Sequence, residues 1–285
     1  LSPNGVVLIP NGVVLSPGAA VPGANVSRAA LAVHCVARLF PVRHLPRHRM
    51  LVGPRSQKGD NPAMSSQSTW HPVMPAAGVR AGGAVVAARV QDQRLALWRG
   101  TSGTVQAWDD RCPHRGVALS LGRVLGDRLA CAYHGWEYAE GSGRCIAIPA
   151  MPQQPVPGKV CVATHAALEQ AGMVWVAPGA VSPPGPPPSA QHDTPAQFLR
   201  SMAVAAPHAT VEAALAEQAF TSAGPCQWRG HCAGHGLYLW LLDAAADWCM
   251  LHVASTTTRP GEPTPPALLF HALRILRDRL QTAPP

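Results

Sequence analysis

Hydrophobic and polar residues alternate in short runs between residues 70 and 177, a pattern typical of β-strands. Leu95 and Leu97 share one side of a predicted strand, Arg94–Arg99. Ala96 and Trp98 share the other side. Turn residues separate further predicted strands: Ala84–Val90, Thr104–Trp108, Arg128–Ala132, Cys145–Ile148, Val160–Thr164 and Gly172–Val176. Short strands at this spacing predict a mainly β domain built from antiparallel, sandwich-like sheets.

The pattern changes after a proline-rich segment at residues 178–188, which we predict to be a stiff linker. Beyond it, the composition of Ala209–Phe220 predicts a helix, and Leu237–Leu242 and Trp248–Ala254 read as two strands joined by a turn. Leucines at positions 269, 273, 276 and 280 follow the helical period, with arginines on the opposite face. Residues 189–285 are therefore predicted to form a small α+β segment.

The first 63 residues differ from the rest of the chain. They contain a tandem repeat of Pro-Asn-Gly-Val-Val-Leu, many Pro, Gly and Ala residues, and an irregular basic stretch. The character of the sequence changes at Met64. We predict that residues 1–63 are a disordered N-terminal extension and that residues 64–177 form the β domain.

Charge and cysteine content exclude some classes of protein. The formal net charge is +8, but +6 of it falls within residues 1–63, and the chain has no run of five or more Lys and Arg. This distribution lacks the basic surface that nucleic acid requires. The eight cysteines are scattered, which favours a reducing, cytoplasmic setting over a disulfide scaffold. No apolar run reaches the roughly 18 residues of a membrane helix, so we expect no membrane partner.

Two short stretches each combine one cysteine with one histidine. They read Arg-Cys-Pro-His-Arg-Gly at residues 111–116 and Cys-Ala-Tyr-His-Gly-Trp at residues 131–136. Two thiolates on one iron and two neutral imidazoles on the other form the ligand set of a Rieske-type [2Fe–2S] cluster. We predict that four residues bind this cluster: Cys112, His114, Cys131 and His134.

The residues around these ligands suit two tight loops. Pro113 restricts the first loop, while Gly116 and Gly135 permit sharp turns and a close approach of the backbone. Tyr133 and Trp136 are expected to shield the cluster, and a Tyr133 hydroxyl is a candidate hydrogen-bond donor to a ligand sulfur. A structural zinc site is the less favoured alternative, because zinc fingers usually pair Cys with Cys and His with His in sequence.

The two stretches and their surroundings resemble the Rieske domain of ring-hydroxylating and O-demethylating oxygenases. The resemblance extends over about residues 70–177. It includes four further short segments: Trp70 to Val73, Asp109-Asp110, Ile148-Pro149 and Gly172 to Trp175. Rieske proteins of respiratory complexes carry an additional cysteine in each loop, where this chain has Val117 and Tyr133. The resemblance therefore implies the oxygenase branch and a potential near the bottom of the Rieske range of about −150 to +300 mV.

Oxygenases of this kind also carry a mononuclear iron, held by two His and one carboxylate. The family's motif fits residues 211–224 in part: Glu212 matches, but Ala213, Ala216, Ala219 and Gly224 stand where the motif has Asn, Asp, His and His. His231 and His235 are alternative ligands if helical, although the surrounding glycines favour an exposed loop. The resemblance thus implies a short, degenerate catalytic domain, and a mononuclear Fe(II) is doubtful.

Three functions stay open at this point. The preferred one is an iron–sulfur oxidoreductase of the oxygenase family, which transfers single electrons in support of O₂-dependent hydroxylation or demethylation by a monooxygenase or dioxygenase. The others are a ferredoxin-like electron carrier without catalytic iron and, less favoured, a zinc-binding module. The resemblance implies an NAD(P)H-dependent reductase or a ferredoxin as electron donor, and a homo-oligomer, commonly a trimer. The sequence does not identify a substrate.

Overall fold

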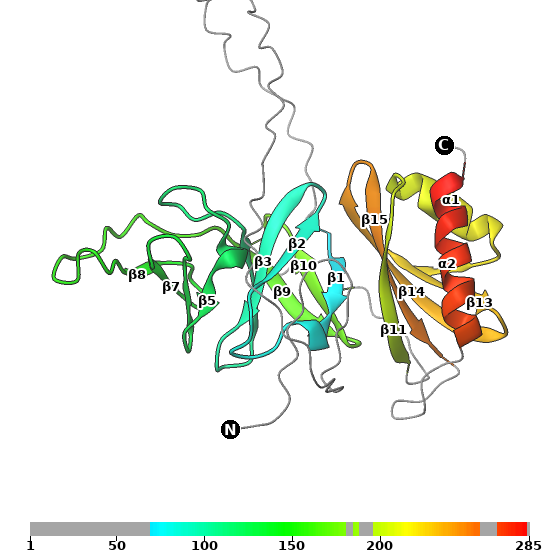
Figure 1. The fold of residues 1–285 in the computed structure, drawn as a ribbon, viewed down its shortest axis with the longest axis horizontal. Coiled ribbons are helices and arrows are strands. Elements are labelled where there is room, and N and C mark those ends of the chain that lie inside the picture. The colour runs from blue at the N-terminus through cyan, green and yellow to red at the C-terminus, as the bar shows by residue number, and fades with distance from the viewer. Residues whose placement is uncertain (1–68, 181–184, 188–195, 257–266, 284–285) are drawn as a thin grey trace, which may run out of the picture. The chain divides into compact units, whose positions relative to one another are not determined.

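The computed structural model describes residues 69–180, 185–187, 196–256 and 267–283 (Figure 1). All of them belong to one unit, Asp60–Pro285. The predicted extension at residues 1–63 lies outside the described residues, as do parts of the predicted linker and of the segment that follows it. The domain boundaries proposed from the sequence therefore stay predictions.

Six antiparallel strands form the first sheet, in the order β1-β10-β9-β4-β3-β2. Their bounds are β1 His71–Pro75, β2 Val86–Val90, β3 Gln93–Arg99, β4 Val105–Asp109, β9 Thr164–Gln170 and β10 Met173–Ala177. The alternation read in Arg94–Arg99 is confirmed, because Leu95 and Leu97 enter one core cluster and Ala96 and Trp98 enter another. The strands predicted around β2, β4 and β10 are confirmed as well.

The strand predicted at Val160–Thr164 is wrong. Only an isolated bridge between Cys161 and Arg144 forms there, and the regular strand β9 begins at Thr164. Val160 and Val162 are apolar because they pack into the core beside the small sheet, and not because they belong to a strand.

The small second sheet has the order β5-β6-β7-β8. Its strands are β5 Arg123–Val124, β6 Arg128–Ala130, β7 Glu137–Ala139 and β8 Cys145–Ala147, of which β6 and β8 were predicted. Trp98 and Trp108 from the first sheet meet edge to face at 4.8 Å, within the same core as Leu129 and Tyr138 of the second sheet. This shared core fixes the small sheet, and with it both cysteine–histidine stretches, against the larger one.

The C-terminal part is a five-stranded sheet covered on one face by two helices (Figure 1). The order is β11-β15-β14-β13-β12, with bounds β11 Gln197–Val204, β12 Thr221–Gly224, β13 Gln227–Cys232, β14 His235–Ala245 and β15 Trp248–Ser255. The helices are α1 His208–Glu217 and α2 Ala267–Thr282. Both helices and the hairpin β14–β15 agree with the prediction of a small α+β segment.

The two faces of this sheet have different partners. Every buried leucine of α2 packs, as its spacing predicts, against the face that carries Leu251 and Val253. Leu242 and Ala244 of β14 instead join the core of the first sheet, next to Val73. Trp70 donates its indole N–H to the carbonyl of Gly185 at 3.0 Å, which links this described residue of the proline-rich segment to the start of the first sheet.

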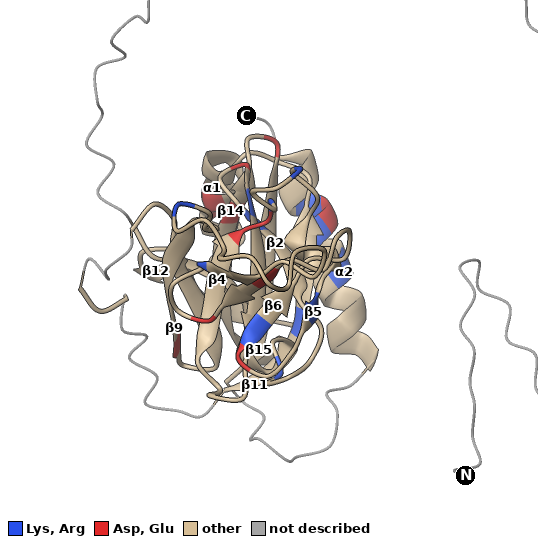
Figure 2. Ribbon diagram, turned by 90° about the vertical axis from the view of Figure 1, so that its left-hand side faces the viewer, with Lys and Arg blue, Asp and Glu red and all other residues tan. Residues whose placement is uncertain are grey.

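The surface of the described elements is mixed in charge. In the view of Figure 2, basic and acidic residues are interspersed over several elements. Within the described residues, no helix is long and apolar enough to cross a membrane. The seven cysteines in this part of the chain are all free thiols.

Candidate metal centre

The two cysteine–histidine stretches fold into two loops closed by the same pair of backbone hydrogen bonds. In the first, the Cys112 N–H donates to the Val117 carbonyl at 2.8 Å, and the Gly116 N–H donates back to the Cys112 carbonyl at 2.8 Å. In the second, Cys131 bonds to the Trp136 carbonyl at 2.9 Å, and Gly135 bonds back to Cys131 at 3.1 Å. Both closures thus link residues five and four apart, so each loop presents its cysteine and histidine in the same way.

The closing glycine of each loop needs a backbone conformation that other residues rarely adopt. Gly116 has φ +73° and Gly135 has φ +68°. A side chain in this left-handed region is strained, whereas glycine adopts it at little cost. The role that the sequence suggested for these two glycines follows from this geometry.

The loops bring like ligands together in pairs. The Cys112 and Cys131 thiols are buried within the same core cluster. The His114 and His134 rings lie at the surface, with their Nδ1 atoms 3.1 Å apart. Two soft sulfur donors on the inside and two imidazole nitrogens on the outside fit a binuclear cluster whose irons have different ligands. The facing Nδ1 atoms identify the nitrogens that could bind iron.

Aromatic side chains hold the two imidazoles. Trp136 stacks on His114 with ring centroids 4.2 Å apart and an angle of 5° between the planes. Tyr133 packs against His134 at 3.8 Å and 31°. The predicted shielding thus takes the form of one aromatic ring on each imidazole, which limits ring rotation and covers one face.

Burial and neighbouring charges shift the pKa values of two of the proposed ligands. Burial raises the pKa of Cys131, and the nearby Cys112 thiol adds to the effect. Desolvation and the charges of His134 and Arg115 lower the pKa of His114. The Cys131 thiol must therefore lose a proton to bind iron, whereas lowering the pKa of His114 favours the neutral imidazole that acts as a ligand.

The hydroxyl that reaches a ligand sulfur is not the one considered from the sequence. The side chain of Tyr133 is 60% exposed and lies on His134. Tyr138 of β7 is fully buried, with its hydroxyl 3.1 Å from Cys112 Sγ. Burial and the contact with Cys112 raise the pKa of Tyr138, so the phenol stays protonated and donates to a Cys112 thiolate. The sequence around Tyr138 offered one signal for this role, the alternation of a buried residue with partly exposed neighbours in β7.

Replacing Tyr138 with phenylalanine should lower the reduction potential of the cluster. The hydrogen bond to sulfur stabilises the reduced, more negative form, so its loss favours the oxidised form. A net contribution of about 1 kcal/mol corresponds to roughly 40 mV for a one-electron couple. A redox titration followed by visible absorption measures the shift, and Tyr133→Phe is the control expected to leave the potential in place. Equal potentials for Tyr138→Phe and the parent protein would exclude this role.

Asp110 fixes the start of the first loop. Its carboxylate accepts hydrogen bonds from the Ser120 N–H at 2.7 Å, from the Ser120 hydroxyl at 2.9 Å and from Arg94 at 3.3 Å. The side chain is almost completely buried, and one residue, Arg111, separates it from Cys112. This anchor between β3 and the far end of the loop was missed by reasoning from ligand types alone.

The segment that matches the family's mononuclear-iron motif in part, residues 211–224, shows no such convergence of side chains. Glu212, Ala213 and Ala216 lie on α1, Ala219 follows the helix with φ +60°, and Gly224 ends β12. Glu212 is 3.5 Å from His208 at the start of the same helix. Within the described residues, no three His, Cys, Asp or Glu side chains are grouped around a single metal position.

The alternative pair His231 and His235 lies neither on a helix nor in a long loop. His231 belongs to β13 and opposes Gly236, and His235 belongs to β14 and opposes Cys232. Residues that oppose each other share a face of a sheet, and successive residues alternate between faces. The two histidines therefore project from opposite faces of the hairpin and cannot bind one ion together.

Known proteins similar to this chain match the segment that contains the two cysteine–histidine loops. The family model of the Rieske [2Fe–2S] domain matches residues 69–166. The oxidoreductase NdmD of Pseudomonas putida is 45% identical over 101 residues, which cover 35% of this chain and 17% of NdmD. The 3-chlorobenzoate-3,4-dioxygenase oxygenase subunit of Comamonas testosteroni is 39% identical over 108 residues, or 38% of this chain and 25% of that subunit. The matches thus span a quarter or less of these relatives.

The structural similarity reaches further along the chain than the sequence similarity. The structure of NdmA from Pseudomonas putida CBB5 superimposes with a TM-score of 0.58 and 20% identity, covering 77% of this chain and 82% of NdmA. This comparison includes the C-terminal sheet and shows its fold. Residues 69–166 of this chain are a Rieske [2Fe–2S] domain, and the chain has the fold of the Rieske non-haem iron oxygenases.

Proposed function

We propose that this chain is a one-electron oxidoreductase of the Rieske oxygenase type. Its [2Fe–2S] cluster is bound by four residues: Cys112, His114, Cys131 and His134. The observation that carries the proposal is the pair of identically closed loops, which bring two thiols together inside and two imidazole Nδ1 atoms together at the surface. When bound, the cluster supplies one-electron chemistry, and the electrons support O₂-dependent hydroxylation or demethylation.

The arrangement argues against the zinc-binding alternative. Structural zinc is bound tetrahedrally by four ligands that converge on one ion. Here the thiols are buried and the imidazoles exposed, so the two kinds of ligand occupy different depths in the site. Two metal positions, one for each pair, fit this separation better than one.

The same geometry suits electron exchange with another protein. His114 and His134 are at the surface, so a partner can approach the histidine-bound end of the cluster. We propose an NAD(P)H-dependent reductase or a ferredoxin as the electron donor, and a homo-oligomer, which the Rieske oxygenase fold favours. Val117 and Tyr133, which stand in place of the extra cysteines of respiratory Rieske proteins, support a potential near −150 mV, and a measured value above about +100 mV would contradict this assignment.

Chemical analysis of the anaerobically reconstituted protein tests the proposal directly. We expect about two irons and two acid-labile sulfides per chain, the composition of the cluster itself. Zinc without sulfide would refute the assignment. A third iron would place O₂ chemistry on this chain, whereas two irons would make this chain the electron-transfer component.

A further inference from the structure

A surface hollow of about 350 Å³ lies beside the first cysteine–histidine loop. Residues 111–116 of that loop, which include the proposed ligand His114, form one wall, and residues 161–163 before β9 form another. The proposed ligand of the second loop, His134, does not line it. The hollow therefore borders only one of the two surface imidazoles, and the surroundings of the two histidines differ.

Two arginines of the hollow carry charges that no described carboxylate neutralises. Arg111 and Arg115 are exposed, and neither takes part in an ion pair with another described residue. The side chain of Arg111 lies over the loop, with its Nε 3.4 Å from the position that a Cβ on Gly116 would occupy. Because a guanidinium stays protonated at every physiological pH, both charges are permanent.

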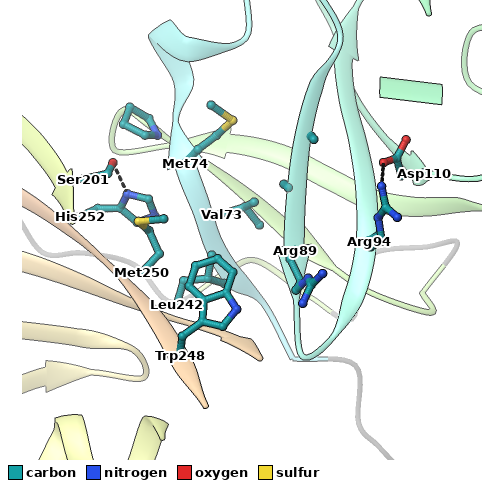
Figure 3. A pocket seen from close by; sticks show the side chains of 13 residues that line it. Val73, Met74, Arg89, Arg94, Asp110, Ser201, Leu242, Trp248, Met250 and His252 are labelled. Carbon is teal, nitrogen blue, oxygen red and sulfur yellow. Dashed lines mark hydrogen bonds and ion pairs between the residues drawn. The ribbon is translucent and has the colours of Figure 1, made fainter. Parts of the chain in front are cut away.

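The carboxylates near these arginines are engaged elsewhere. Asp109 also lines the hollow, but its Oδ1 already accepts a hydrogen bond from the Gln93 side chain at 2.8 Å. Asp110, which precedes Arg111 in the sequence, is paired with Arg94 at 3.3 Å, as Figure 3 shows. Two arginines and a single carboxylate leave the lining of the hollow with a net positive charge.

Two further cations border the wall that carries Cys161. Arg144 forms an isolated bridge with Cys161, and its Nη2 lies 4.0 Å from the position of a Cβ on Gly158. Lys159 is exposed two residues before Cys161. Neither of these cations enters an ion pair within the part of the chain that the structure describes. The surface on this side of His114 thus attracts negative charge.

We infer that this basic hollow is the docking site of the electron donor, and that the donor is a protein with an acidic surface around its own redox centre. The inference rests on the proposed function, since it names the partner of the same site. Donor carboxylates can pair with the guanidinium groups of Arg111 and Arg115 in two-point contacts, which places the donor beside His114. The step is the transfer of one electron, which oxidises the donor, reduces the cluster and breaks no bond.

Two reductants of opposite charge test the inference on the full-length, cluster-loaded protein. Reduced plant-type ferredoxin is an acidic protein with a potential near −400 mV, well below that expected for this cluster. The methyl viologen radical is a small cation. Stopped-flow absorption measures the second-order rate constant of each. At low ionic strength, Arg111→Glu and Arg144→Glu should each slow the reaction with ferredoxin by about threefold or more, but not the reaction with viologen. In about 0.5 M salt the difference should shrink.

Arg80→Glu is the matched control for both variants. Arg80 is exposed and precedes Ala81, which bridges to Arg99 at one end of β3. The hollow lies near the other end, where Asp109 pairs with Leu95. The same reversal of charge at this distance should leave the rate with ferredoxin close to that of the parent. An unchanged visible spectrum and potential show that each variant keeps its cluster.

The outcomes separate the inference from the proposed function. If viologen does not reduce the parent protein, no redox-active cluster is present, and the proposed function fails together with the inference. If viologen reduces it, but ferredoxin reacts equally fast with the parent, Arg111→Glu and Arg144→Glu, the docking site alone is refuted. A rate with ferredoxin that does not fall as salt is added to the parent would refute it as well. If Arg111→Glu loses its spectrum, Arg144→Glu decides, because Arg144 lies outside both loops.

Discussion

Cys131→Ala is expected to yield protein without the [2Fe–2S] cluster, with iron and acid-labile sulfide both near zero after reconstitution. The proposed site offers only one other thiolate, Cys112, so the sulfur-bound iron would lose half of its protein ligands. A cluster that needs two thiolates on one iron does not assemble on a single thiolate. Visible absorption, together with iron and sulfide analysis, measures the effect.

Cys161→Ala is the control for this variant. Cys161 is an exposed free thiol that lines the surface hollow beside the first loop, close to the site but outside the proposed ligand set. It should retain the full cluster content. Retention of two irons and two sulfides in Cys131→Ala would show that Cys131 is not a ligand, and loss in both variants would point to general damage to the fold instead.

The sequence predicted a strand well where its two faces pack into two different hydrophobic cores. Arg94–Arg99 alternates because one set of side chains packs toward β1 and β10 and the other toward the small sheet. β1 was missed because two prolines interrupt its five residues, a composition that an edge strand tolerates and a central strand does not. β9 was misplaced because Thr164–Gln170 has little β-branched character and gains its conformation from pairing with β10.

The C-terminal hairpin shows how a local signal can mislead. The glycines around His231 suggested a loop, but Gly230 lies within β13, where a Cβ would collide with the ring of Phe220. The glycine is there to let that ring pack against the strand. Only the tertiary structure reveals this reason, because Phe220 is distant from Gly230 in the local pattern and close to it in space.

In the candidate site too, some residues could be predicted from the sequence and others could not. Ligand types and spacing were enough to predict the four cluster residues, because the chemistry of the cluster restricts them to two soft thiolates and two imidazoles. Tyr138 reaches Cys112 from β7, and Asp110, which directly follows β4, anchors the first loop through Ser120 ten residues away. Contacts between residues that are far apart in the sequence have no fixed spacing, so the sequence alone could not predict the contacts of Tyr138 and Asp110.

The proposed iron ligation further predicts that His134→Cys lowers the reduction potential. The substitution keeps a ligand at this position but replaces a neutral imidazole with a negatively charged thiolate. The additional negative charge stabilises the oxidised cluster, and clusters bound by four cysteines have potentials near −400 mV. We expect a decrease on the order of 100 mV in a redox titration of the purified variant.

His231→Cys makes the same substitution in β13, outside the two loops, and should leave the potential unchanged. The exposed position of His134 favours this experiment, because a cysteine there meets solvent and the partner loop rather than a packed core. The cluster can then form with three thiolates and one imidazole, and the shift reports the charge of the ligand alone. A variant with the parent's potential and visible spectrum would mean that His134 does not bind iron, and the assignment of the histidine-bound iron would have to be abandoned.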